Sequence, residues 1–276
     1  MNIFEAIHGG ETHRLWIGGH RGHTSAVREN TTANFAEVLG MGVDYIEIDV
    51  QLTADGVPVV FHDTGLSRLS DASGSLADYT WDALQAVTLR DEYAHPGETA
   101  KIPSLEMVLQ AAPNDIGLLI ELKGDALRQE QLAEAVLRLV EQYDFGGRAM
   151  FMSLDYYSVM LLHAAHPEWW VGYCVFGSVG DIDDSIWRYN IDFLAVEENM
   201  VTNRLVTQAR EHGLPTYVWS VNDNEKMLQY MEMGAVGIIS DWTDTRAVVD
   251  AFNAAHSGVE YAGRDEAPAQ DTARLQ

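Results

Sequence analysis

Short apolar runs alternate with longer segments of helical periodicity along most of the chain. Eight of these runs are predicted to be β-strands: Leu15–Gly18, Tyr45–Leu52, Gly117–Leu122, Ala149–Ser153, Trp170–Val175, Phe193–Val196, Thr216–Trp219 and Gly237–Ile239. The predicted helices are Thr31–Met41, Ser104–Ala111, Ala126–Tyr143, Tyr156–Ala165, Ile182–Tyr189, Val201–His212, Asn224–Met233 and Thr243–Ala254. Strands that alternate with helices in this way form parallel βαβ units.

The number of these units favours a closed barrel. The chain has 276 residues, and single (β/α)8 barrels commonly have about 250. The alternative is an open, doubly wound sheet, which more often carries a glycine-rich dinucleotide fingerprint that this sequence lacks. We therefore expect an α/β chain folded as a (β/α)8 TIM barrel over residues 1–262.

One connection, after the second strand, is unusually long. Ala54–Gly56 predicts a turn, and Val57–Phe61 predicts a second extended run. Residues 64–101 then form a predicted insertion with one short helical piece near Trp81–Val87, and connections of this length usually have a functional role. The polar stretch 263–276 has no periodic pattern and is expected to be a disordered tail.

The charge balance excludes one class of partner. The chain has 42 acidic and 17 basic side chains, a formal net charge of -25. Binding to DNA or RNA normally depends on clustered Lys and Arg that displace counterions from phosphates, and no such cluster is present. A small anionic substrate remains compatible with this charge if a bound divalent cation supplies local positive charge.

The sequence also bears on the compartment. The single cysteine, Cys174, makes neither an internal disulfide nor a cysteine-based zinc site, which suits a reducing environment. Met1–Arg14 lacks the apolar run of a signal peptide, and no stretch of about 18 apolar residues predicts a spanning helix. We expect a cytoplasmic protein, with a soluble part of a membrane-anchored protein as the alternative. No feature of the sequence indicates the oligomeric state.

Carboxylates occupy one face of the second and third predicted strands. Because side chains alternate across a strand, Glu47 and Asp49 share one face of the second strand, while Ile48 and its apolar neighbours share the other. Glu121 and Lys123 share a face of the third strand. Two carboxylates on an inward face are costly unless they are paired, and a hard cation with oxygen ligands removes that cost. Sequential strands usually lie side by side, so Glu121 is placed to complete a cation site.

Two histidines end extended runs in the same half of the chain. His20 follows the first strand, and His62 follows Val57–Phe61. Histidine titrates near neutral pH, so one imidazole can accept a proton while the other donates one. Arg21 offers a guanidinium fork for a phosphate. Catalytic residues of barrels come from the carboxyl ends of different strands, which is where these side chains are expected.

These pieces together resemble the glycerophosphodiester phosphodiesterase family, over roughly residues 16–241. The motifs that carry the resemblance are His20-Arg21-Gly22, Glu29-Asn30-Thr31, Glu47-Ile48-Asp49-Val50, Asp55-Gly56, Val59-Val60-Phe61-His62-Asp63, Glu121-Leu122-Lys123 and Trp219-Ser220-Val221-Asn222. The N-terminal motifs are highly specific in order and spacing.

The resemblance implies a function for each of these groups. It implies that Glu47, Asp49 and Glu121 bind Ca²⁺ or Mg²⁺. It further implies that His20 and His62 are the acid/base pair, that Arg21 and Lys123 hold the phosphate, and that Trp219 lines the substrate pocket. Glu29 is expected either to contact the substrate or to orient Arg21. For Asn30, its position before a predicted helix favours an N-cap role. In the family the reaction is thought to give glycerol phosphate and an alcohol through a cyclic phosphate.

Alternatives remain open within this interpretation. A phospholipase D-like lyase would use the same site but leave the cyclic phosphate, and a catalytically silent barrel would only bind ligands. Another diester, such as a phosphoglycerol-decorated glycan or glycerophosphoinositol, is also compatible with the motifs. His23 and Arg28 depart from the family pattern where small residues and proline are usual, and Ser220 and Ser240 stand where threonine is usual.

Overall fold

The computed structural model describes residues 15–22, 29–90, 100–114, 116–124, 126–177, 184–241 and 246–256. Met1–Arg14, His23, Arg28 and residues 263–276 therefore lie outside the described ranges. Within them, no helix combines the length and the apolar composition needed to cross a membrane.

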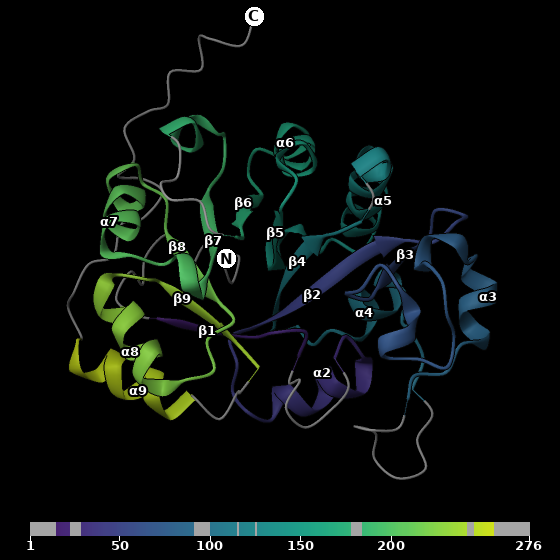
Figure 1. The fold of residues 1–276 in the computed structure, drawn as a ribbon, viewed down its shortest axis with the longest axis horizontal. Coiled ribbons are helices and arrows are strands. Elements are labelled where there is room, and N and C mark those ends of the chain that lie inside the picture. Colours follow the sequence, from purple (N-terminus) through teal and green to yellow (C-terminus); the bar gives the residue numbers. More distant parts are fainter. Residues whose placement is uncertain are drawn as a thin grey trace, which may run out of the picture.

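Eight parallel strands close into a barrel that helices surround on the outside (Figure 1). The barrel strands are β1 (Trp16–Gly19), β2 (Tyr45–Leu52), β4 (Gly117–Leu122), β5 (Ala149–Ser153), β6 (Trp170–Val175), β7 (Phe193–Glu197), β8 (Thr216–Trp219) and β9 (Gly237–Ser240). Their hydrogen-bonded order is β1-β9-β8-β7-β6-β5-β4-β2, and β2 pairs in turn with β1. This closure confirms the predicted TIM barrel and excludes the open sheet.

The alternation of side chains along the strands divides the core into two layers. On β2, Ile46, Ile48 and Val50 pack outward in a cluster that includes helix residues. The inner layer consists of Trp16, Tyr45, Leu119, Met150, Met152, Trp170, Cys174, Phe193, Ala195, Tyr217 and Ile239. Burial of each large apolar side chain contributes about 1.5–3 kcal/mol. The faces of β2 are therefore those that its alternation predicts, with Glu47 and Asp49 on the inward face.

Aromatic rings fill the barrel interior where neighbouring strands carry glycine. A Cβ at Gly18 would overlap the ring of Tyr45, and a Cβ at Gly237 would overlap the ring of Tyr217. Those two rings meet edge to face with centroids 6.2 Å apart. The interior is thus a packed core and not a pore, so chemistry is confined to the side chains at the strand ends.

Helices connect the strands, and polar residues cap several of them. The α-helices around the barrel are α2 (Thr32–Leu39), α4 (Leu105–Ala111), α5 (Gln129–Gln142), α6 (Tyr156–Ala165), α7 (Asn203–Glu211), α8 (Asn224–Met233) and α9 (Arg246–Ala255). The side chains of Ser104, Asp155 and Thr202 accept hydrogen bonds from backbone N–H groups in the first turns of α4, α6 and α7. Such caps account for the close agreement with the predicted helix starts.

The helix predicted for Ile182–Tyr189 is wrong in type over its described part. Asp184–Arg188 form a 3₁₀ helix, and the N–H of Tyr189 donates to the carbonyl of Ile186 at 3.1 Å. Ile186 and Tyr189 are three residues apart, a spacing that fits the three-residue turn of a 3₁₀ helix as well as one face of an α-helix. The apolar pattern alone does not separate the two.

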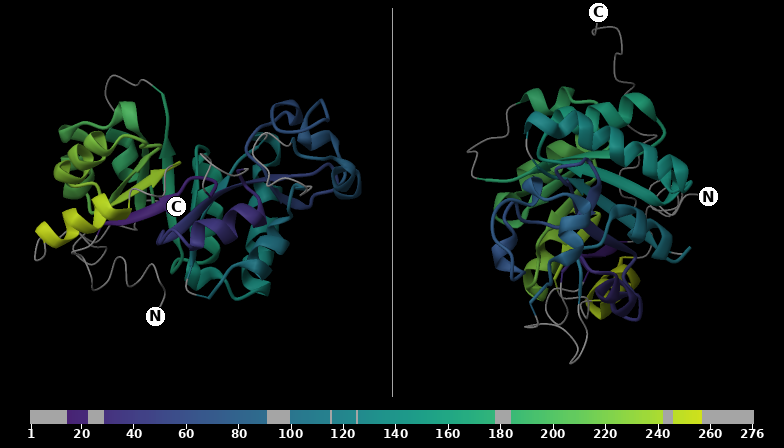
Figure 2. Two further views of the ribbon diagram at one scale, coloured as in Figure 1. Left: turned by 90° about the horizontal axis from the view of Figure 1, so that it is seen from below. Right: turned by 90° about the vertical axis from the view of Figure 1, so that its right-hand side faces the viewer.

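The segment after β2 forms a unit beside the barrel, coloured blue in Figure 2. Its elements are β3 (Pro58–Val60), the 3₁₀ helices η1 (Leu66–Arg68) and η2 (Leu76–Asp78), and α3 (Trp81–Ala86). β3 pairs antiparallel with β2, as the predicted turn and second extended run imply. The unit has its own core of Val59, Phe61, Leu66, Leu76, Leu84, Val87, Leu89 and Ile102. It is therefore a packed structure anchored to the barrel through β3.

Candidate active site

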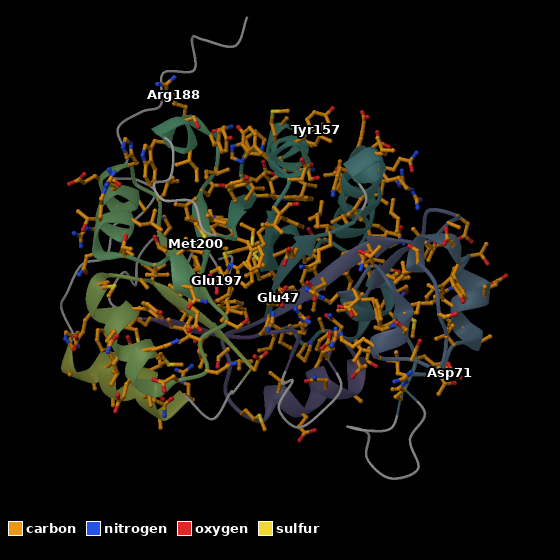
Figure 3. The ribbon with its side chains drawn as sticks, viewed as in Figure 1. Glu47, Asp71, Tyr157, Arg188, Glu197 and Met200 are labelled. Atoms are coloured by element: carbon orange, nitrogen blue, oxygen red, sulfur yellow. The ribbon has the colours of Figure 1, made fainter. Side chains whose placement is uncertain are left out.

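Three carboxylates from neighbouring strands converge inside the mouth of the barrel. Asp49 of β2 lies directly beside Glu121 of β4 in the strand register, and Glu47 precedes Asp49 on the same face. One oxygen from each of the three lies within 4.8 Å of the others. Figure 3 shows Glu47 near the centre of the molecule, whereas Asp71 and Arg188 lie at its periphery. The structure thus brings together the three residues predicted as cation ligands.

Burial makes this cluster costly without a cation. All three carboxylates are buried. Burial, with the neighbouring carboxylates, raises the pKa of Glu47 well above its ordinary value, and it raises the pKa of Glu121 to about 7. Burial also acts to raise the pKa of Asp49, but Lys123 and Arg21 outweigh it and lower that pKa. Oε1 of Glu47 has no hydrogen-bond partner among the described residues. The donor set and this orphaned oxygen fit a hard divalent cation.

Two cationic side chains border the carboxylates. The Lys123 ammonium lies 3.0 Å from Oε1 of Glu121 and 3.4 Å from Oδ1 of Asp49. Nε of Arg21 lies 3.2 Å from Oδ2 of Asp49, and the Arg21 backbone N–H donates to Oε2 of Glu47 at 2.9 Å. Lys123 also borders a cavity of about 310 Å³, and Thr64 of the unit beside the barrel helps to line it. Positive charge therefore lies beside the carboxylates and next to open space.

His20 follows β1 and is held through one ring nitrogen. Its Nδ1 lies 2.7 Å from Oδ1 of Asp241 and 3.1 Å from Oγ of Ser220. Its Nε2 points toward the carboxylate cluster and lies 4.0 Å from Oε2 of Glu47. Asn222 donates to the other oxygen of Asp241 at 2.6 Å. Asn222 belongs to one of the sequence motifs and Asp241 ends the region of resemblance, but the sequence does not indicate that they orient His20.

His62 is likewise held by a carboxylate at Nδ1. Its Nδ1 lies 2.7 Å from Oδ1 of Asp63. The Gln51 side chain donates from Nε2 to the carbonyls of Phe61, His62 and Asp63 at 2.6, 2.9 and 3.0 Å. Burial lowers the pKa of His62, Asp49 raises it, and Arg21 and Lys123 lower it further. The net effect favours the neutral imidazole near pH 7.

Glu29 and Asn30 both contribute to the site. Glu29 accepts a hydrogen bond from Nη1 of Arg21 at 3.0 Å. The N-cap role expected for Asn30 is wrong, because Thr31 caps α2 by accepting from the N–H of Asn34. The side chain of Asn30 donates instead to Oδ2 of Asp49 at 2.8 Å. An N-cap needs extended backbone, and Asn30 has φ 57° in the left-handed region.

Trp219 ends β8 at the same mouth of the barrel. Its ring stacks on Phe176 with centroids 5.8 Å apart. Phe176, which follows β6, is 65% exposed. The two rings form an apolar surface at the mouth, and Trp219 also packs against the inner core. This position is compatible with the pocket-lining role expected for Trp219, while the same ring packs against the inner core.

Arg68 is a residue of the site that sequence reasoning missed. It lies in η1, outside the barrel strands. Its guanidinium donates to Asp63 at 2.5 and 2.9 Å and to Glu29 at 2.9 and 2.7 Å. No local sequence pattern links Arg68 to Glu29, because the two residues are 39 positions apart. The only signal is its position five residues after Asp63.

Comparison with known proteins identifies the family of this chain. The model of the glycerophosphoryl diester phosphodiesterase family matches residues 20–245. The Bacillus subtilis protein YhdW is 30% identical over 233 residues, which are 83% of this chain and 96% of that protein. A glycerophosphodiester phosphodiesterase of Caldanaerobacter subterraneus is 26% identical over 82% of this chain and 93% of its own.

Solved structures share the fold. A phosphodiesterase of Oleispira antarctica, solved with its product sn-glycerol-3-phosphate, has a TM-score of 0.79 at 24% identity, over 86% of this chain and 97% of that chain. A glycerophosphodiester phosphodiesterase of Thermotoga maritima has a TM-score of 0.68 at 25% identity, over 85% and 97% of the two chains. Because the family model spans most of the sequence, this chain belongs to the glycerophosphoryl diester phosphodiesterase family, whose members are phosphoric diester hydrolases.

Proposed function

We propose that this chain hydrolyses glycerophosphodiesters to glycerol phosphate and an alcohol, in a reaction that depends on a divalent cation. The observation that carries the proposal is the arrangement of two imidazoles around one carboxylate cluster. His20 and His62 are each bound at Nδ1 by a carboxylate, and the cluster of Glu47, Asp49 and Glu121 lies in the same mouth.

The cation ligands we propose are Glu47, Asp49 and Glu121, with Ca²⁺ or Mg²⁺ as the ion. Oxygen ligands, full burial and the orphaned oxygen of Glu47 support this assignment. When bound, such an ion supplies positive charge that neutralises the non-bridging oxygens of a phosphodiester. Arg21 and Lys123, which border the carboxylates, are placed to bind the same phosphate.

His62 is the proposed base. A hydrogen bond from Nδ1–H to Asp63 leaves the lone pair of the neutral imidazole on Nε2, and burial keeps the imidazole neutral near pH 7. In the proposed step, Nε2 accepts the proton of the glycerol 2-hydroxyl as its oxygen bonds to phosphorus.

His20 is the proposed acid. Asp241 holds its Nδ1 at 2.7 Å, and its Nε2 is directed toward the carboxylate cluster, 4.0 Å from Oε2 of Glu47, where a substrate phosphate would be bound. As the bond from phosphorus to the leaving alcohol breaks, His20 donates a proton to that oxygen. The two histidines exchange roles when water opens the resulting cyclic phosphate, so the net products are glycerol phosphate and the alcohol.

The decisive experiment is an assay of purified protein on a panel of glycerophosphodiesters with Ca²⁺, with Mg²⁺ and with EDTA. Phosphorus NMR of the products identifies the reaction: glycerol phosphate supports hydrolysis, and a persistent cyclic phosphate indicates the lyase alternative. Absence of cation-dependent turnover on every diester would leave a ligand-binding barrel and refute the proposal.

Histidine variants test the assigned pair. We expect His20→Ala and His62→Ala to lose about 100-fold or more in kcat, the range for a positioned acid or base. His212→Ala, at an exposed histidine that ends α7 and stacks on Trp187, is the matched control and should keep wild-type kcat. Full activity in either site variant would exclude that histidine from the reaction.

A further inference from the structure

One guanidinium outside the barrel is shared by two carboxylates of the site. Arg68 donates from Nε and Nη2 to the two oxygens of Asp63, and from Nη1 and Nη2 to the two oxygens of Glu29. All four hydrogen bonds measure 2.5 to 2.9 Å. A planar fork that binds two carboxylates at once fixes the separation and the orientation of both.

Asp63 and Glu29 each hold a different residue of the proposed active site, His62 and Arg21 respectively. Asp63 binds Nδ1 of His62 at 2.7 Å. Glu29 binds Nη1 of Arg21 at 3.0 Å, and Arg21 continues to Asp49 at 3.2 Å. A continuous chain of charged contacts therefore runs from the imidazole of His62, through Arg68, to the guanidinium of Arg21.

The position of Arg68 depends on the packing of the unit beside the barrel. Leu66, two residues before Arg68 in η1, is fully buried in the core of that unit. The N–H of Leu66 donates to the carbonyl of Gly74 at 3.1 Å, and Gly65 pairs with Ser75. The guanidinium is thus presented to the barrel by a packed scaffold and not by a free loop.

We infer that Arg68 is a positioning residue for the proposed diesterase reaction. It orients His62 through Asp63, and it orients Arg21 through Glu29. The inference rests on the proposed function. The unit beside the barrel thus supplies a positive charge that both His62 and Arg21 require. The hydrogen bonds of Arg68 go to Asp63 and Glu29 and not to the carboxylate cluster or to Nε2 of His62.

The charges around His62 give the inference a measurable consequence. The groups that act on this imidazole are Asp63 beside it, Asp49 from β2, Arg21 after β1 and Lys123 after β4. Burial acts to raise the pKa of Asp63, but hydrogen bonds from Arg68 and His62 outweigh it and lower that pKa to about 2. Removal of Arg68 leaves the charge of Asp63 uncompensated, so His62 retains its proton to higher pH.

Three variants test this. Arg68→Gln removes the charge and the fork, and Arg68→Lys keeps the charge but cannot bind two carboxylates in a plane. Arg90→Gln is the control, since Arg90 lies in the same unit and its Nε donates to the carbonyl of Ser70. We expect Arg68→Gln to lower kcat about 10- to 100-fold, with KM changed less than about threefold, and to move the acid limb of the pH profile upward. Arg68→Lys should recover part of kcat and of the shift, and Arg90→Gln should match wild type.

A second readout does not depend on turnover. Long-range ¹H–¹⁵N NMR reports which ring nitrogen of His62 is protonated, with the signal assigned from a His62→Asn sample. We expect the Nδ1–H tautomer in wild type and a mixed or protonated ring in Arg68→Gln at the same pH. If the wild type is inactive on every diester, the proposed function fails, but the NMR result still decides the role of Arg68. Unchanged kcat, pH profile and tautomer in Arg68→Gln, or failure of Arg68→Lys to recover any of them, would overturn the inference.

Discussion

The side-chain amide of Asn30 donates a hydrogen bond to Oδ2 of Asp49 at 2.8 Å. Asn30 adopts a left-handed backbone with φ 57°, and its N–H donates to the carbonyl of Arg21 at 2.9 Å. Arg21 has φ 53°. Arg21 and Asn30, nine residues apart in the sequence, are thus joined by a backbone hydrogen bond, and the side-chain amide of Asn30 holds one of the proposed cation ligands.

This contact predicts an effect on cation affinity. Asn30→Gly keeps the left-handed backbone but loses the hydrogen bond to Asp49, so we expect about 10-fold weaker Ca²⁺ or Mg²⁺ binding, at the lower end of the range for partners of metal ligands. Isothermal titration calorimetry on chelated protein measures this. Thr31→Ala is the contrasting variant: it removes the cap of α2 and should cost about 1 kcal/mol in stability while leaving cation affinity unchanged. Equal affinities in wild type and Asn30→Gly would show that Asp49 is held by other contacts.

A second prediction concerns Glu121. Glu121→Gln preserves shape and removes one buried negative charge, so the protein without metal should be as stable as wild type or more stable at pH 8. The loss of a cation ligand should remove about 3 kcal/mol of transition-state stabilisation, or about 100-fold in kcat. Thermal unfolding in EDTA and steady-state kinetics with Ca²⁺ measure the two effects. Glu106→Gln, on α4, serves as a control because Glu106 contacts only Tyr143 in the described hydrogen bonds and lies away from the cluster.

Cation binding is expected to depend on pH. In the protein without metal, Glu121 has a pKa of about 7 because of burial, whereas an unfolded chain would lose this proton near 4.5. Between these values the folded state holds more protons than the unfolded state, so stability falls as the pH rises. A cation must displace this proton at pH 6 but hardly at pH 8, so Ca²⁺ should bind about tenfold more weakly at pH 6. Titrations at the two pH values, in buffers of different ionisation enthalpy, test the proton release; pH-independent affinity would contradict it.

The pH profile of the reaction follows from His62. The net effect of burial and neighbouring charges places its pKa below the ordinary 6.5. Because the proposed base must be neutral, kcat/KM should rise with pH through that pKa, and the midpoint of the acid limb should lie below 6.5. Rates on a diester with saturating cation, from pH 4.5 to 8, give the midpoint. A limb centred well above 6.5, or an unchanged limb in a weakly active His62→Asn variant, would assign it to another group.

The alternation of side chains along the strands is enough to predict which carboxylates face the inside of the barrel. A period of two places Glu47 and Asp49 opposite Ile46 and Ile48, so one strand alone predicts which side chains face inward. The adjacency of Glu121 follows from the rule that consecutive strands lie side by side. The barrel, the strand positions and the convergence of these carboxylates are therefore accessible without coordinates.

The partners of the histidines are not accessible in this way. Asp63 stands in a recognisable motif and Asp241 ends the region of resemblance, yet their contacts with His62 and His20 depend on side-chain directions in loops that have no period. Arg68 reaches Glu29 across 39 residues, which no local rule anticipates. The N-cap prediction for Asn30 is wrong for a different reason. Its residue type and position suit an N-cap, but its backbone is left-handed, and Thr31 caps the helix instead.

Gln51 holds three consecutive carbonyls after β3 while its own strand carries Glu47 and Asp49. A single hairpin therefore sets the separation between the cation ligands and the imidazole of His62. A residue inserted into or removed from this hairpin would therefore shift the imidazole relative to the carboxylates, even if every side chain of the site were kept.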